Sequence, residues 1–212
     1  MNKEYPKKIA DNVTMFSADP ILYVVDSFIS NDECDAFIEA SQGKLRPSTV
    51  ISPDKHIQHE SRTSENCWIE HDANDIVHEV SKRFSILVQM PIRNAEQYQL
   101  VYYKKGAQYR PHFDSFNYET EDGKNNWEPG GQRMITVIAY LNDVEEGGET
   151  GFPELGIKIP PKKGDVVVFH NTLLNDSATH PKINPRSLHG GMPVIKGEKW
   201  MVNLWFRENL RY

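Results

Sequence analysis

The sequence predicts one α+β domain in which helices come first and short strands follow. Before Pro91, two segments carry apolar residues at helical spacing; beyond it, glycine, proline and asparagine turns divide the chain into short apolar runs. Successive short strands of this kind are typical of a β-sandwich or jelly roll. A length of 212 residues suits a single domain with one sizeable core.

The first helix is expected directly after Ser30. Ser30 and Glu33 have the spacing of a capping box, and Phe28 precedes them as a possible apolar contact for the first turn. In this helix Cys34 and Phe37 share the face that would enter the core.

A second helix is expected from about Asp72 until Pro91 stops it, and residues 43–61 between the helices indicate a long polar loop or irregular hairpin. The strands expected after Pro91 are 96–103, 107–113, 133–141, 157–159, 165–170, 187–189 and 198–207.

Composition limits the classes of function. The net charge is −6 and the pI is near 5.8, so the sequence predicts no broad basic face for nucleic acid. Cys34 and Cys67 are too few for a disulfide framework. The N-terminal residues lack the apolar run of a secretory signal, and no stretch approaches the roughly 20 apolar residues of a membrane span. We therefore expect a cytoplasmic protein without a membrane partner.

Three residues predict a metal centre: His112, Asp114 and His189. Two imidazoles and one carboxylate are the facial triad that holds non-haem Fe(II) and leaves coordination positions open. Side chains at i and i+2 of a strand point to the same face, so His112 and Asp114 can chelate one ion. The third ligand then has to come from a distant strand.

Ten residues after His189, Lys199 opens a segment with two different faces. Trp200, Val202, Leu204 and Phe206 form an apolar face, whereas the other face mixes charged, amide and aromatic side chains: Lys199, Met201, Asn203, Trp205 and Arg207. Such a mixture is typical of the lining of a polar cavity. A lysine there can receive a carboxylate, although a surface lysine at a strand end would look the same in sequence.

In these residues the chain resembles the prolyl 4-hydroxylases, which are 2-oxoglutarate- and Fe(II)-dependent dioxygenases. The similarity includes the His112-x-Asp114 motif, His189 and Lys199. It extends to four longer segments, 26–34, 62–68, 103–112 and 131–150, and thus covers residues from about 20 to 207.

The resemblance implies a double-stranded β-helix, a jelly roll of the cupin kind, with supporting helices at the N-terminal side. We expect residues 1–20 to be an N-terminal extension and residues 21–212 a single dioxygenase domain. Within that domain, residues 21–92 would give helical support and residues 93–208 the jelly-roll core.

The resemblance also implies cofactors and residue roles. Fe(II), 2-oxoglutarate and O2 would be used, and ascorbate is admitted as a further ligand. Tyr103 would assist Lys199 in binding 2-oxoglutarate, while Glu96, Arg133 and Trp205 would bind a proline-containing peptide or protein, as in procollagen-proline 4-dioxygenases. Related sequences often have histidine at the position of Arg207, which leaves the peptide preference open.

Two further loops, 115–132 and 171–187, flank the expected metal ligands. One or both of them, with residues 43–61, are expected to close over a substrate. Alternatives stay open at this point. The same cofactors could serve hydroxylation of free proline, lysyl residues or a small metabolite, and a nucleic-acid demethylase is disfavoured by the acidic balance. A cupin-like metal-binding module without turnover would need neither Lys199 nor Tyr103. Whether the protein is a monomer or a homodimer is not determined by the sequence.

Overall fold

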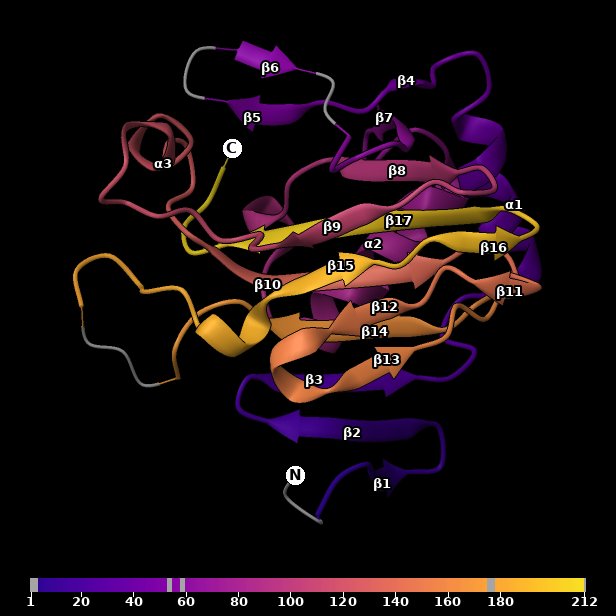
Figure 1. Ribbon diagram of the computed structural model, residues 1–212, viewed down its shortest axis with the longest axis horizontal. Coiled ribbons are helices and arrows are strands. Elements are labelled where there is room, and N and C mark those ends of the chain that lie inside the picture. Colours follow the sequence, from indigo (N-terminus) through magenta and orange to yellow (C-terminus); the bar gives the residue numbers. More distant parts are fainter. Residues whose placement is uncertain (1–3, 53–54, 58–59, 175–177, 212) are drawn as a thin grey trace.

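The structure, a computed structural model, describes residues 4–52, 55–57, 60–174 and 178–211. Two antiparallel sheets lie face to face, with the smaller sheet in front of the larger one in Figure 1. In the nine-stranded sheet the order is β1-β2-β3-β14-β10-β17-β8-β7-β4, and in the four-stranded sheet it is β13-β12-β15-β9. This arrangement confirms the α+β class and the jelly-roll core.

The strands of the large sheet are β1 (Lys7–Ala10), β2 (Val13–Ala18), β3 (Ile21–Val25), β4 (Arg46–Pro47), β7 (Glu65–Ile69), β8 (Tyr98–Tyr103), β10 (Arg133–Tyr140), β14 (Val166–His170) and β17 (Lys199–Arg207). Those of the small sheet are β9 (Tyr109–His112), β12 (Thr150–Phe152), β13 (Ile157–Ile159) and β15 (His189–Gly191). Two short pairs are separate from both: β5 (Val50–Ser52) with β6 (Lys55–Ile57), and β11 (Glu146–Gly147) with β16 (Val194–Lys196).

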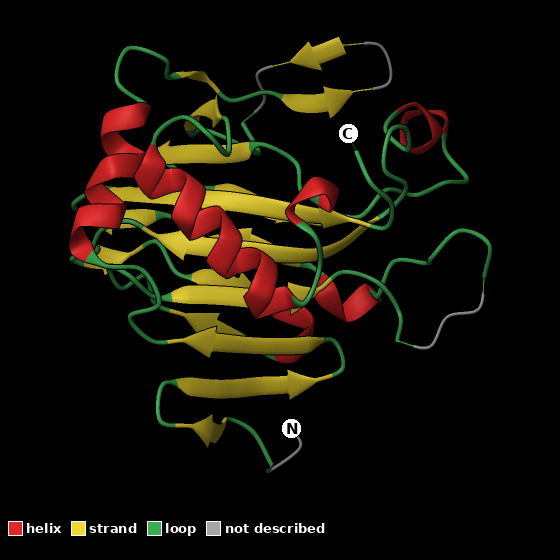
Figure 2. Cartoon of the chain, turned by 180° about the vertical axis from the view of Figure 1, so that it is seen from behind, coloured by secondary structure: helices red, strands yellow, loops and turns green. Residues whose placement is uncertain are grey.

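Helices α1 (Asn31–Ala40) and α2 (Asp75–Val88) cover the back of the large sheet, as Figure 2 shows. The expected capping box is present, because Ser30 accepts from the amide of Glu33 while the Glu33 carboxylate accepts from the amide of Ser30. The remaining helical segments are η1 (Ile92–Asn94), α3 (Glu121–Asn125), η2 (Pro153–Leu155) and η3 (Pro185–Ser187). No helix in these described ranges is long and apolar enough to span a bilayer.

The core has two layers because successive strand side chains point to opposite faces. On β17, Val202, Leu204 and Phe206 pack toward the helices, as expected from the sequence. Met201 points the other way, into the apolar layer between the two sheets. The alternation predicted for this strand is therefore confirmed from Lys199 to Phe206, and it places Lys199, Met201, Asn203 and Trp205 on the inner face of the jelly roll. Arg207, which was expected on the same face, does not join them.

The structure also contains strands that the sequence analysis did not predict. Within residues 1–20, β1 and β2 pair with each other, and β2 extends the large sheet through β3. Four side chains of β2 are half-buried, so its burial lacks the strict alternation by which strands are recognised. The strand expected at 187–189 begins instead at His189, because Pro185 and Ser187 belong to the helical turn η3.

Candidate active site

The three candidate metal ligands come from two neighbouring strands of the small sheet. His112 is the last residue of β9, Asp114 follows two positions later, and His189 is the first residue of β15. The two strands run antiparallel, and their register pairs His112 directly with His189. Sheet pairing therefore brings the distant third ligand to the His-x-Asp motif, as the sequence analysis required.

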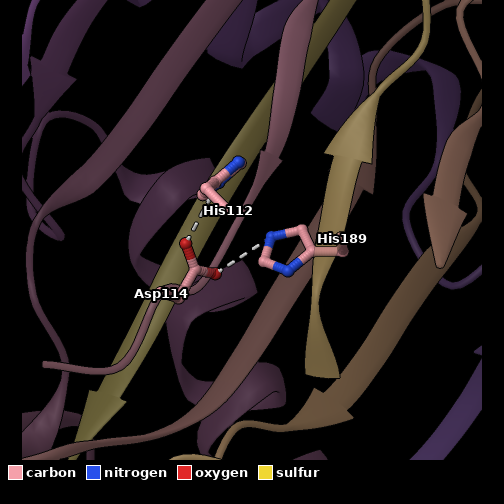
Figure 3. Close-up of side chains that lie close together, drawn as sticks. All are labelled: His112, Asp114 and His189. Carbon is pink, nitrogen blue, oxygen red and sulfur yellow. Dashed lines mark ion pairs between the residues drawn. The ribbon is translucent and has the colours of Figure 1, made fainter. Parts of the chain in front are cut away.

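Their side chains converge, as Figure 3 shows. One ligand atom from each of the three residues lies within 4.8 Å of the others. The Nε2 atoms of His112 and His189 lie 3.6 and 3.4 Å from the two carboxylate oxygens of Asp114. No other metal-binding group of this kind exists among the described residues.

Backbone carbonyls fix the orientation of both imidazoles. The Nδ1 of His112 lies 2.9 Å from the carbonyl oxygen of Arg110, and that of His189 lies 3.0 Å from the carbonyl oxygen of Ser187. Because a carbonyl can only accept, each Nδ1 carries the proton and each Nε2 keeps a lone pair. Such outer hydrogen bonds are usual for histidines that ligate metals.

Asp114 is buried, and hydrogen bonds from neighbouring side chains hold its carboxylate in place. Burial acts to raise the pKa of its carboxyl group, but the two histidines and Arg133 bring the pKa below its ordinary value. Thr136 donates to one carboxylate oxygen of Asp114 at 2.8 Å, and Asn171 donates to the Thr136 hydroxyl at 2.8 Å. Burial also lowers the pKa of His189 to about 4, so the site combines a carboxylate with neutral imidazole.

Lys199 is deeply buried, and only 1% of it is exposed. Its ammonium nitrogen donates to the carbonyl oxygen of Gly148 at 2.7 Å. Burial lowers the pKa of Lys199 to about 7, and Glu149 acts in the opposite direction without restoring the ordinary value. A surface lysine is therefore excluded, and a bound carboxylate would stabilise the buried ammonium.

Two tyrosines flank this lysine. Its nitrogen lies 5.5 Å from the ring centre of Tyr103 and 5.2 Å from that of Tyr140. Tyr103 is opposite Lys199 in the register of β8 and β17, and burial raises its pKa to about 12, so its hydroxyl stays a donor. Tyr140 shares a hydrogen bond of 2.7 Å with Thr150.

Arg133, Glu96 and Trp205 also come together. Arg133 donates through Nε and Nη2 to the two oxygens of Glu96, at 2.6 and 2.8 Å. Its guanidinium carbon lies 3.9 Å from the ring centre of Trp205. The pKa of Glu96 is lowered: burial acts to raise it, but the charge and hydrogen bonds of Arg133 and the charges of Arg207 and Arg211 together outweigh burial. Arg133 is thus held in a fixed orientation by a fork-shaped ion pair and an aromatic face.

All eight site residues expected from the sequence line one cavity of about 600 Å³. Its lining includes the metal-site candidates, the lysine and tyrosine, and the arginine group: His112, Asp114, His189, Tyr103, Lys199, Glu96, Arg133 and Trp205. A second cavity, of about 770 Å³, lies beside α2 and contains none of the three metal-site candidates.

Some lining residues were missed by sequence reasoning. Trp68, which was not among the expected site residues, is 47% exposed and lies beside Trp205 with ring centres 6.2 Å apart. The reason is its place on β7, where the neighbouring positions Cys67 and Ile69 are the ones that enter the core. Arg62 and Phe116 also line the cavity. Alternation along the short β7 could have indicated the outward position of Trp68.

Comparison with known proteins agrees with this site. A family described as the 2OG-Fe(II) oxygenase superfamily matches residues 98–207. Probable prolyl 4-hydroxylase 7 of Arabidopsis thaliana is 35% identical over 91% of this chain, which spans 64% of that relative's length. Prolyl 4-hydroxylase 5 of the same plant is 34% identical over 92% of this chain and 70% of its own length.

A solved structure is similar over most of the fold. It is the 2OG complex of the viral collagen prolyl hydroxylase from Paramecium Bursaria Chlorella virus-1, with 30% identity and a TM-score of 0.68 over 88% of this chain and 95% of that chain. This chain belongs to the prolyl 4-hydroxylase family, within the 2OG-Fe(II) oxygenase superfamily. It is therefore a 2-oxoglutarate-dependent dioxygenase.

The residues present fit the cofactors of this family, Fe(II) and 2-oxoglutarate. Two imidazole lone pairs and one carboxylate converge on a single point, which is the donor set of a non-haem iron site. A buried lysine with a lowered pKa lies in the same cavity and can bind an organic anion. Both groups of residues line one cavity.

We predict that Thr136→Val weakens Fe(II) binding about tenfold, since a lost outer hydrogen bond to a ligand typically costs 10–100-fold in affinity. Valine keeps the shape of threonine but cannot donate to Asp114. The measurement is anaerobic calorimetric titration with Fe(II), and Thr14→Val on β2, far from the cavity, is the matched control. Equal affinity in Thr136→Val and wild type would contradict the proposed support of Asp114.

The lowered pKa of Lys199 predicts a pH dependence of 2-oxoglutarate binding. Above pH 7 the free lysine is increasingly neutral, whereas a bound carboxylate favours the ammonium form, so binding takes up a proton. The dissociation constant should therefore rise above pH 7, by up to about tenfold per pH unit. Titration of the metal-loaded protein between pH 6 and 9 measures it.

Lys199→Arg is the control for this pH dependence, because arginine stays charged throughout the range. Its binding profile should be flatter than that of wild type above pH 7. Parallel profiles in the two proteins would assign the pH dependence to another group.

Proposed function

We propose that the protein hydroxylates prolyl residues of a peptide or protein and forms 4-hydroxyproline, succinate and CO2 from 2-oxoglutarate and O2. The observation that carries this proposal is the shared cavity. A fixed guanidinium, an indole ring and a buried lysine line it together with the three candidate iron ligands. Lys199 begins β17 and Trp205 lies near the end of that strand, so a co-substrate and a ring-shaped substrate can occupy different parts of one cavity.

His112, Asp114 and His189 would hold the iron. When bound, Fe(II) supplies the activation of O2, of which one atom enters succinate during decarboxylation of 2-oxoglutarate and the other enters the substrate C–H bond. The chain itself contributes fixed ligand orientations through the carbonyls of Arg110 and Ser187. Thr136 directs the Asp114 carboxylate through a hydrogen bond, while the two histidines and Arg133 hold the pKa of Asp114 below its ordinary value.

Lys199 would bind the carboxylate at the far end of 2-oxoglutarate. Within the described part of the chain, the carbonyl oxygen of Gly148 is the one hydrogen-bond acceptor of its ammonium, and the ring of Tyr103 lies close by. An anion at this position would offset the cost of the buried charge. The co-substrate would in this way be oriented before the second substrate enters.

Arg133 and Trp205 would position the prolyl residue. Arg133 has its Nε and Nη2 directed to Glu96, which leaves Nη1 as the donor nearest Asp114, 3.5 Å from the Asp114 carbonyl oxygen. That nitrogen can donate to the carbonyl of a peptide, and the buried Trp205 offers an apolar wall to a pyrrolidine ring. Free proline, lysyl residues or a small metabolite remain the alternative substrates.

Loops 115–132 and 171–187 are proposed to close over the peptide. They lie side by side at one end of the jelly roll in both views, Figure 1 and Figure 2. Tyr118 of the first loop stacks on His180 of the second with ring centres 3.6 Å apart, and Trp127 packs edge-on against the same imidazole. Part of the third proposed segment, 43–61, and the residues 175–177 lie outside the described residues.

Ascorbate binding and a cytoplasmic location stay predictions of the sequence. The non-catalytic module is the weaker alternative, because it would not require a buried lysine and tyrosine beside the triad.

The function is tested by succinate formation from 2-oxoglutarate and O2 by Fe(II)-loaded protein. A Pro-Pro-Gly repeat peptide, poly(L-proline), a lysyl peptide and free proline are compared by mass spectrometry. We expect a prolyl peptide to stimulate turnover and to gain one oxygen on the ring. Oxidation of the lysyl peptide or of free proline instead would replace the substrate and keep the dioxygenase.

Replacement of Arg133 is expected to act on the peptide alone. Arg133→Ala should raise the peptide KM about 100-fold, because it removes a charge-assisted donor and leaves Glu96 buried without its principal partner. The dissociation constants for Fe(II) and 2-oxoglutarate should stay within about twofold, as measured by anaerobic titration. Parallel loss of all three affinities would show damage to the fold.

A further inference from the structure

Arg207, the last residue of β17, is buried although it carries a charge. It is 3% exposed and does not line the catalytic cavity. Its guanidinium carbon lies 4.8 Å from the ring centre of Phe116, which does line the cavity. Arg207 therefore lies behind Phe116 and does not face the cavity in which a substrate would bind.

The donors of Arg207 are directed at the loop 115–132. Its Nε donates to the carbonyl oxygen of Gly131 at 2.8 Å. Its Nη2 donates to the carbonyl oxygens of Asn126 at 2.9 Å and Trp127 at 2.7 Å, and also to that of Gly131. One buried side chain thus binds three backbone acceptors in the segment that leads from α3 back to β10.

The remaining terminal nitrogen of Arg207 donates to Glu96. The distance from Nη1 to Oε1 is 3.1 Å, and the same oxygen accepts from Arg133 at 2.6 Å. Arg133 and Arg207 are therefore joined through one carboxylate oxygen. Hydrogen bonds to a buried charge are stronger and more directional than neutral ones, so this link is stiff.

Close packing supports the contact. Gly130 has a φ of +105°, and a Cβ built on it would lie 3.1 Å from the Cβ of Arg207 and 2.9 Å from the Cγ of Arg211. Only glycine combines this backbone conformation with such a close approach. The loop therefore packs directly against Arg207. The catalytic cavity is lined by other residues of the same loop, namely Asn117, Thr120, Asp122 and Asn126.

We propose that Arg207 is a positioning residue that holds the loop 115–132 and the guanidinium of Arg133 in one rigid unit. This inference rests on the proposed function, in which Arg133 contacts the peptide. Through Glu96, the orientation of Arg133 and the position of the loop become coupled. Peptide binding then depends on a residue that never touches the peptide.

Arg211 provides the matched control. It also forms an ion pair with Glu96, at 3.5 Å, but its side chain is more exposed than that of Arg207. None of the hydrogen bonds described for the loop carbonyls comes from the Arg211 guanidinium. Arg211→Lys and Arg207→Lys each keep a positive charge, whereas only Arg207→Lys removes the fork that binds three carbonyls.

The first experiment needs no substrate. Amide hydrogen exchange is followed in residues 116–131 of wild type, Arg207→Lys and Arg211→Lys. Exchange in this loop should become about tenfold faster in Arg207→Lys and stay near wild type in Arg211→Lys. Exchange at the wild-type rate in a folded Arg207→Lys protein would overturn the inference.

A second variant keeps the test decisive if Arg207→Lys does not fold. Glu96→Gln keeps the shape of the side chain but removes the charge shared by Arg133 and Arg207. Its loop exchange should rise as well, by at least about threefold, because the buried arginine loses its anion. Unchanged exchange in folded Glu96→Gln would equally overturn the coupling.

The second experiment measures the peptide KM with the Pro-Pro-Gly repeat peptide or poly(L-proline), whichever wild type oxidises. Arg207→Lys should raise KM about tenfold, and Arg211→Lys should change it less than about twofold. The dissociation constant of 2-oxoglutarate is measured alongside as a check on the other end of the site. A wild-type KM in Arg207→Lys would overturn the coupling to peptide binding.

The two arms separate this inference from the proposed function. If wild type oxidises neither peptide, the proposed substrate is wrong, and hydrogen exchange still decides whether Arg207 holds the loop. If wild type oxidises a peptide while Arg207→Lys matches it in both exchange and KM, the proposed function stands and the inference fails.

Discussion

The pairing of β9 with β15 is the constraint on which the site depends. Its register sets His112 opposite His189, and a slip by one residue would turn one imidazole to the other face of the sheet. Gly190 permits the close approach of the strands, because a Cβ at this position would lie 2.8 Å from the carbonyl oxygen of Tyr109. The metal ligands are thus placed by backbone pairing before any ion contributes.

The buried charges of Lys199 and Glu96 differ in how far neighbouring groups compensate them. Lys199 is buried with a carbonyl as its hydrogen-bond partner, and its lowered pKa reflects the cost. Glu96 is surrounded by the guanidinium groups of Arg133, Arg207 and Arg211. The lysine end gains most from an incoming anion, whereas the glutamate end is already compensated and stiff. In the proposed function, the lysine end would bind the small co-substrate, and the other end would present a preformed surface to the prolyl substrate.

The loops 115–132 and 171–187 contact each other and the residues around the cavity. The loop 115–132 begins just after Asp114, contacts the loop 171–187 through Tyr118 and His180, and is held at its far end by Arg207. Gln132 adds a second connection, since it donates to the carbonyl oxygens of Phe116 and Pro181. Closure over a peptide would therefore involve both loops together.

The sequence by itself predicted the candidate metal ligands, Lys199 and the inward face of β17, through residue type, strand alternation and the resemblance to a known family. It also determined the capping box of α1, which depends on contacts within one turn. It did not predict strands β1 and β2, because these strands are defined by pairing with each other and by the pairing of β2 with β3 rather than by a local pattern. Tertiary structure alone decided that Arg207 turns away from the cavity, because Glu96 and the carbonyls of a distant loop meet only after folding.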